Sequence, residues 1–369
     1  MQTFAKKSRW IKRHPILLLI LSLSVALLIF RTLLPSTLLY FVNNEIQNSK
    51  KITGKIQDLE LGVLSGRIVL HGTQIAAKSN RDFDVNLGRT EVNLRWWPLK
   101  KGRLKFDLKI VGALVVLNIG GPSKKTEDLN KEYEDLRREF RATWPTYLNS
   151  LNIDDLNVRI IDRSDLAIPI FRILETKVHL EGVSNRPENQ FEPARLVFDG
   201  RTSGKGIFAG YLLFSGIEAN PGLKGEIKLR KMDLRFLNPF FRKHANLDLE
   251  SGQLDLFFEF AVQDWRVDGY VKPILSEIKF IDLDKKKEKG FWRILWEQML
   301  TFVAWVLKNE KTDQIAAKIR FSGQLDGPDT NPVSAFGTLV RNAFIEAIQS
   351  GFDRDLKIKP RLLPKKKTP

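Results

Sequence analysis

The sequence predicts a mainly β fold with flanking helices, in which an N-terminal transmembrane helix precedes a long, curled antiparallel sheet. Three observations predict this fold: an uncharged apolar run near the N-terminus, many segments in which apolar and polar residues alternate, and turn residues between those segments. With 369 residues, of which 43% are hydrophobic, the chain is long enough to bury a sizeable core and is not disordered by composition.

The apolar run has the properties of a membrane anchor. Residues 15–30 (PILLLILSLSVALLIF) carry no charge, and with their apolar flanks they cover the ~20 residues that a bilayer core requires. Five basic residues precede the run, whereas after Arg31 the next charge is Glu45, so we expect the N-terminus in the cytoplasm and the main domain exported. A cleaved signal peptide is the rival interpretation, but no small-x-small cleavage site follows the run.

The strand pattern is clearest in two segments, each with an apolar and a polar face. The apolar face of the first consists of Leu104, Phe106, Leu108 and Ile110. The apolar face of the second consists of Leu254, Leu256, Phe258, Phe260 and Val262. Gly112 predicts a bulge or bend beyond the first segment.

The number of such segments predicts a large sheet. Roughly twelve strand candidates, about 4.8 Å apart, would extend over about 55 Å, and a sheet of that size is expected to curl. No long helix separates the strands after residue 150, so we expect an antiparallel meander without parallel crossovers.

Two helical patterns interrupt or follow the strands. Residues 123–150 repeat apolar residues at steps of three and four, which predicts an inserted amphipathic helix. Residues 291–309 have the length of a helix, follow a lysine-rich run and contain three tryptophans, which favour a membrane interface. We expect this helix to lie either on an anionic leaflet or over the open end of the sheet. The tryptophans in question are Trp292, Trp296 and Trp305.

Together these patterns predict the organisation of the chain. The segments are a cytoplasmic tail (1–9), a transmembrane anchor (10–34), a connector (35–50), a β-groove domain (51–281) with the inserted helix at 123–150, a C-terminal helical end with one strand (282–351), and a basic tail (352–369).

Charge and composition narrow the partners. The formal net charge of +17 raises nucleic acid or an anionic membrane surface as a partner, but an exported domain with dispersed basic residues favours the membrane, so we expect no nucleic-acid partner. The absence of cysteine excludes disulfides and thiolate metal sites.

The sequence contains no pattern typical of catalysis. The four histidines are widely spaced, and the GRTSGKG segment at 200–206 lacks the spacing and the hydroxyl residue of a phosphate loop. We therefore expect a protein that is not an enzyme and has neither a metal nor another cofactor.

Several phrases of the sequence carry a resemblance to a known family. The N-terminal run, ITGKIQDLELGVLSGRIVLHGTQI, WPLKKGRLKFDLKI and the long segment LRFLNPFFRKHANLDLESGQLDLFFEFAVQDWRVDGYVKPIL resemble the AsmA-like envelope proteins of Gram-negative bacteria, in particular a short membrane-anchored branch that ends in a segment like TLVRNAFIEAI. The resemblance spans residue 1 to about residue 355. It implies a taco-shaped or tapered sheet with an apolar concave face, anchored in the inner membrane, extending into the periplasm and used to pass phospholipid. Larger family members are several times longer, so a groove of this length is not expected to reach the outer membrane alone.

The function that these observations favour is the holding or passing of phospholipid along the apolar β-groove, as part of envelope lipid homeostasis. A lipid tail gains about 0.8 kcal/mol for each methylene that an apolar surface buries, so the two apolar faces would line the groove. Two alternatives stay open. Alternating strands also form the filled interior of a sandwich or barrel, and an envelope scaffolding factor would instead bind a protein partner along a strand edge.

Overall fold

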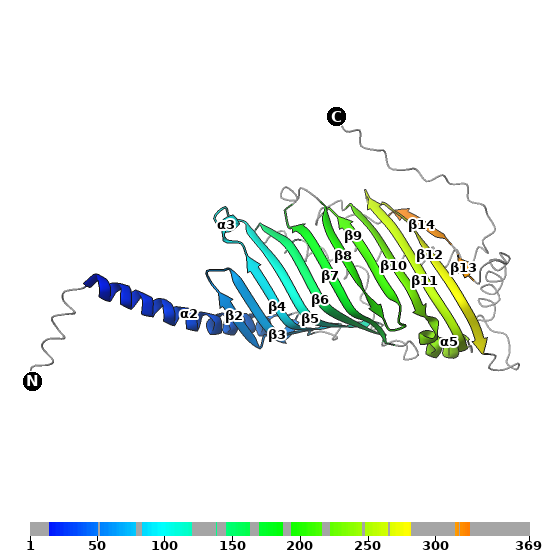
Figure 1. Ribbon diagram of the computed structural model, residues 1–369, viewed down its shortest axis with the longest axis horizontal. Helices are drawn as coiled ribbons and strands as arrows, with labels where there is room; N and C mark the ends of the chain where they lie inside the picture. The colour runs from blue at the N-terminus through cyan, green and yellow to red at the C-terminus, as the bar shows by residue number, and fades with distance from the viewer. Residues whose placement is uncertain are drawn as a thin grey trace, which may run out of the picture.

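The computed structural model consists of one large sheet and a few helices (Figure 1). The residues that it describes are 15–50, 52–78, 83–119, 138, 145–162, 170–186, 193–215, 222–245, 248–264, 266–281, 314–316 and 318–324. The helices are α2 (Pro15–Asn48), α3 (Trp96–Leu99), the 3-10 turn η2 (Leu234–Leu237) and α5 (Asn238–Ala245). The strands are β1 (Ile52–Lys55), β2 (Asp58–Gly62), β3 (Arg67–Ala77), β4 (Phe83–Leu94), β5 (Leu104–Ile119), β6 (Thr146–Asp162), β7 (Phe171–Ser184), β8 (Ala194–Thr202), β9 (Ile207–Phe214), β10 (Leu223–Asp233), β11 (Asp248–Gln263), β12 (Arg266–Ile281), β13 (Gln314–Ala316) and β14 (Ile319–Gln324).

The described strands form a single 14-stranded sheet that does not close on itself. Its main path runs β1-β3-β4-β5-β6-β7-β8-β9-β10-β11-β12-β13, while β2 pairs with β3 and β14 pairs with β12. At about 4.8 Å between neighbours, this path extends over roughly 53 Å. The predicted mainly β class, with a large and mostly antiparallel sheet, is confirmed.

One pairing differs from the predicted antiparallel meander. β5 and β6 are parallel, and the connection between them, residues 120–145, is longer than the roughly twelve residues that a parallel pairing needs to return the chain to the same end of the sheet. The predicted helix at 123–150 is wrong at its C-terminal end: β6 begins at Thr146, where its backbone pairs with β5 and β7. Arg138 is helical, and the rest of that predicted helix lies outside the described residues.

The helix α2 continues the apolar N-terminal run as far as the sheet. Its 34 residues correspond to about 51 Å at 1.5 Å per residue. Among the described residues, no helix combines the length and the apolar character that are needed to cross a bilayer. The predicted anchor at 10–34 includes residues 10–14 and the side chains of 15–20 and 26–30, which lie outside the description, so it stays a prediction.

The C-terminal end of α2 is held against the first strands by its own polar groups. The amide of Asn43 donates from Nδ2 to the Ile56 carbonyl oxygen (3.0 Å) and accepts the Ile56 N–H at Oδ1 (2.7 Å). Lys78 Nζ, just after β3, donates to the Gln47 carbonyl oxygen (3.0 Å). The helix is therefore fixed to one edge of the sheet, from which it extends outward (Figure 1).

A line of residues with left-handed backbone crosses β3 to β7 and interrupts the pairing of the strands. The register places Gly72, Gly88, Gly112 and Asp155 opposite one another on successive strands, and Glu175 follows on β7. Gly72, Gly112, Asp155 and Glu175 all have positive φ, between 49° and 71°. At Gly112 the pairs on either side keep the same register, so the predicted bulge is not seen there, whereas its φ of 71° agrees with the predicted bend. Register shifts, which mark bulges, occur on this line between β6 and β7.

Candidate functional site

The register brings the two predicted apolar faces together on one side of the sheet. Residues that lie directly opposite each other on paired strands point to the same face, so the pairs can be followed from strand to strand. The first apolar row runs through Leu61, Ile68, Val92, Leu108, Leu151, Leu180, Leu196, Leu212, Gly225, Phe260, Gly269 and Phe321. The second runs through Leu59, Leu70, Thr90, Ile110, Ile153, Val178, Phe198, Gly210, Ile227, Phe258, Val271 and Ile319. We call the side that carries both rows the apolar face.

Aromatic rings cover the glycines of these rows. A Cβ added to Gly269 would lie 2.4 Å from Phe321 Cζ, and one added to Gly225 would lie 2.8 Å from Phe260 Cε1. Each ring therefore occupies the space that a side chain would fill on the neighbouring strand, an arrangement known from glycines in other sheets. The rows stay apolar across their glycine positions.

The middle and the far end of the apolar face differ in burial. Leu108, Leu151 and Leu196, on three strands of the middle, are only half-buried. At the far end, Phe260 and Val262 are 7% and 6% exposed. They form a packed cluster with Val267 and Phe321, against which Leu212, Leu223 and Phe258 pack. The apolar face is thus partly accessible over its middle strands and forms a small core near β14.

The remaining predicted lining residues take places beside the two rows. Leu256 pairs with Leu229 and Pro273, and these residues continue the apolar face toward the N-terminal end of β11. Leu254, beyond a register shift, pairs with Met232 and Leu275, while Leu104 and Phe106 begin β5 opposite Thr146 and Leu148. Leu104, Phe106 and Leu254 are half-buried. The predicted membrane-interface residues Trp292, Trp296 and Trp305 lie outside the described residues.

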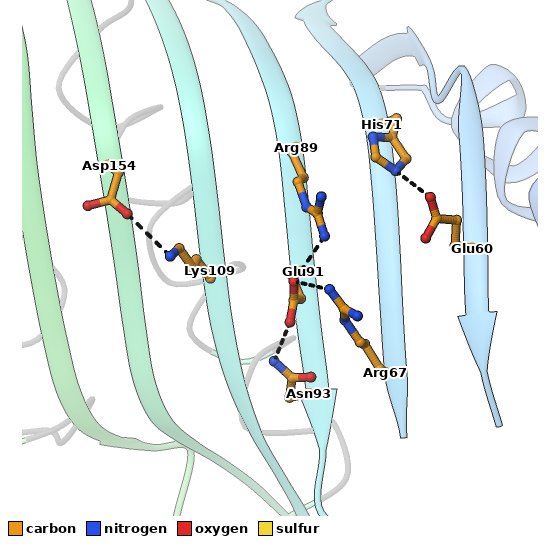
Figure 2. Close-up of polar contacts among 8 residues, drawn as sticks. All are labelled: Glu60, Arg67, His71, Arg89, Glu91, Asn93, Lys109 and Asp154. Atoms are coloured by element: carbon orange, nitrogen blue, oxygen red, sulfur yellow. Dashed lines mark hydrogen bonds and ion pairs between the residues drawn. The ribbon is translucent and has the colours of Figure 1, made fainter. Parts of the chain in front are cut away.

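The opposite face of the sheet is polar and held together by pairs between neighbouring strands (Figure 2). Glu91 accepts hydrogen bonds from Arg67 (2.8 Å), Asn93 (3.2 Å) and Arg89 (3.3 Å). These contacts lower the pKa of Glu91 to about 2, and the hydrogen bond from Arg67 is the largest cause. Farther along the face, Lys109 lies 3.6 Å from Asp154.

Asp107 joins the parallel pair of strands on this polar side. Its Oδ1 accepts hydrogen bonds from Asn149 Nδ2 (2.6 Å) and Ser150 Oγ (2.8 Å) of β6, and Arg95 Nη2 lies 3.0 Å from Oδ2. Desolvation by burial raises the pKa of Asp107, but the three hydrogen-bonding side chains together outweigh it, so the pKa is lowered. The contact lies where the β5–β6 register shifts, which makes Asp107 a structural hub that the sequence alone did not reveal.

Neither face shows the arrangement of a catalytic centre in the part of the chain that the structure describes. A hollow of about 370 Å³ lies on the polar side, lined among others by Glu226, Lys228, Glu259, Tyr270 and Lys272. Lys228 forms an ion pair with Glu226, and a hydrogen bond to Glu259 raises the pKa of Tyr270, so Tyr270 stays a neutral phenol and is not set up as a base. Within the described residues, no group of three or more His, Asp or Glu side chains is placed to hold a metal ion.

No family model and no curated protein matches the chain. The resemblance to AsmA-like envelope proteins therefore stays a prediction. The class that the described residues define is structural: a mainly β protein with an open, mostly antiparallel sheet, one face of which is apolar.

Proposed function

We propose that the protein is a non-enzymatic lipid carrier of the bacterial envelope, anchored in the inner membrane by a single N-terminal helix. In this proposal the N-terminus is cytoplasmic, the sheet lies in the periplasm, and the acyl chains of phospholipids lie on the apolar face. One observation carries the proposal: the two apolar rows cross the sheet from β2 to β14, yet members of the first row on the middle strands, such as Leu108, Leu151 and Leu196, are only half-buried. A face filled by its own packing would bury those members as fully as Phe260.

The energetics suit reversible transport. Burying ten methylenes of an acyl chain against an apolar surface contributes about 8 kcal/mol relative to water. A bilayer interior offers the same chain a similar environment, so exchange between the membrane and the apolar face is close to neutral. Neither specific pockets nor a catalytic group is required for such a carrier.

The tether is supported by the exposed apolar side chains of α2. Leu21, Leu23, Val25 and Leu33 are each about half-exposed or more, which suits contact with lipid rather than with a protein core. Because α2 runs without a break to the contact between Asn43 and Ile56, it would deliver the sheet directly to the membrane surface.

The proposal is tested by photo-crosslinking at two adjacent residues that point to opposite faces. Leu196 belongs to the first apolar row on β8, and Val197 pairs with His179 and Tyr211 on the polar side. A benzophenone amino acid at position 196 of the full-length chain in cells with radiolabelled phospholipid should form a lipid adduct, and one at position 197 should not.

A functional assay complements the crosslinks. Leu196→Asp places a charge where acyl chains would lie and should slow lipid transfer between vesicles, whereas Val197→Asp should leave the rate unchanged. Equal adducts at both positions, or none at 196, would refute lipid binding on this face. A protein adduct at 196 would instead support a scaffolding role.

A further inference from the structure

Two turns at the membrane-proximal end of the sheet together expose an apolar patch. The turn between β2 and β3 carries Val63 (42% exposed) and Leu64 (94% exposed). The single-turn helix α3, between β4 and β5, carries Trp96 (43% exposed) and Trp97 (72% exposed). We call these four residues the tip patch.

The two turns are joined into one rigid unit. Trp96 Nε1 donates to the Leu64 carbonyl oxygen (3.2 Å), and Leu94 N donates to the Gly66 carbonyl oxygen (2.8 Å). Gly66 has a φ of 68°, and a Cβ there would lie 2.4 Å from the Leu94 carbonyl oxygen. The close approach of the two turns therefore requires glycine at position 66. The contacts between the turns hold the tip patch in a fixed arrangement.

Basic residues border the tip patch. Lys100 Nζ lies 4.8 Å from the centre of the Trp97 ring, and Lys101 and Arg103 follow in the same turn. Exposed tryptophan beside lysine is the combination that favours the headgroup layer of an anionic bilayer, because the indole has an apolar body and a polar N–H. Complementary charge therefore points to anionic phospholipid as the occupant.

The position of the tip patch agrees with such a contact. Figure 1 shows α3 and β2 at the end of the sheet from which α2 extends. From Leu34, the end of the predicted anchor, α2 rises about 14 Å to Asn43, where the sheet begins. No charged residue lies between Arg31 and Glu45, so this part of the helix can sit close to the headgroup layer, which extends roughly 6 Å beyond the hydrocarbon core.

We infer that the tip patch is a second membrane contact, which inserts Leu64 and Trp97 into the headgroup layer of the leaflet that α2 leaves. Two contacts fix the orientation of the sheet, whereas a single helix allows rotation about its axis. The patch would thereby hold the β2 end of the apolar face beside the leaflet from which lipid is taken. This inference rests on the proposed tether but not on lipid carriage by the sheet.

The experiment uses single cysteines, because the chain has none of its own. Leu64→Cys and the control Ile207→Cys, which is 57% exposed at the start of β9, each carry an environment-sensitive fluorophore in the full-length chain. Both variants are reconstituted into vesicles of phosphatidylethanolamine and phosphatidylglycerol that contain a shallow doxyl-lipid quencher. We expect loss of emission from the label at position 64 and little loss from the label at 207.

A charge variant separates the basic border from the apolar anchor residues. Each lysine near an anionic surface contributes about 1 kcal/mol, so replacing Lys100 and Lys101 with Gln should weaken the contact roughly fivefold per residue and reduce quenching at position 64. Equal quenching in pure phosphatidylcholine vesicles would overturn the choice of an anionic partner.

Failure of the patch and failure of the tether give different results. If the chain stays with the vesicles after alkaline carbonate but position 64 is not quenched, or is quenched no more than 207, the tip patch is not a membrane contact. If carbonate releases the chain, the tether is refuted, and this inference with it. Crosslinking at position 196 tests lipid carriage independently of both results.

Discussion

The contact between α2 and the sheet yields the most direct prediction. Ile56 is 4% exposed, and its N–H and C=O both bind the side-chain amide of Asn43 at 2.7 and 3.0 Å. Asn43→Ala removes both partners and leaves two buried backbone groups unpaired, at a cost of about 1 to 3 kcal/mol each. With partial access of water after the helix moves away, we expect a loss of about 2 to 4 kcal/mol that is confined to the edge formed by β1 and β2.

Hydrogen exchange measured by mass spectrometry checks this prediction, because it resolves local opening. Peptides that cover residues 52–62 should exchange on the order of 30-fold to 10³-fold faster in Asn43→Ala, while peptides from β8 and β9 should not change. Asn44→Ala serves as the control, since Asn44 is an exposed neighbour on the same helix. Unchanged protection of residues 52–62 in Asn43→Ala would show that the amide does not hold the helix to the sheet.

Two further predictions concern the two faces of the sheet. The pKa of Glu91 is about 2, below its ordinary value of 4.5, so its pairing with Arg67 stabilises the fold above pH ~4.5, and this stabilisation is lost as the pH falls toward 2. Urea unfolding measures the free energy of unfolding at pH 6 and at pH 3. In Glu91→Gln the difference between these two free energies should be smaller by about 0.5 to 1 kcal/mol. On the apolar face, Gly269→Ala should cost about 1 to 3 kcal/mol because Phe321 occupies the space of the new methyl group, while Gly252→Ala, with no contact closer than 3.3 Å, should cost less; equal losses would contradict the account of rings over glycines.

The sequence predicted the features of this fold that depend on local alternation. The apolar faces around Leu108 and Phe258 followed from a period of two, and the bend at Gly112 followed from a glycine within a strand. The parallel pairing of β5 with β6 was not predicted, because it depends on where a long connection returns the chain. The left-handed conformation of Asp155 was also not predicted, because it falls where the β5–β6 pairing is interrupted beside Gly112, and the sequence does not show which residues of the two strands meet.

Of the candidate surfaces, the sequence predicted the local apolar faces but not how the fold joins them or exposes other residues. That strands far apart in the sequence share one apolar row depends on the register of every intervening pair, and no single segment specifies it. The tip patch was also missed, because Leu64 and Trp97 belong to different turns that only the Gly66 contact brings together. A visible signal existed in the adjacent tryptophans of the WWPLKK segment, but their exposure is a property of the folded chain.

The uneven filling of the apolar face limits what the sheet can do alone. Its first row is half-buried from Ile68 to Leu212, but at Phe260 and Phe321 aromatic rings close over the strands and form a packed cluster. The Phe258 and Phe321 rings are stacked, with centroids 5.7 Å apart, so acyl chains could continue past β10 only if these rings moved. If the sheet carries lipid as proposed, lipid would be taken up near the tether and held over the middle strands. Delivery beyond β14 would then require an event that opens the aromatic cluster. A photo-crosslinker in place of Phe321 should therefore form no lipid adducts, in contrast to one in place of Leu196.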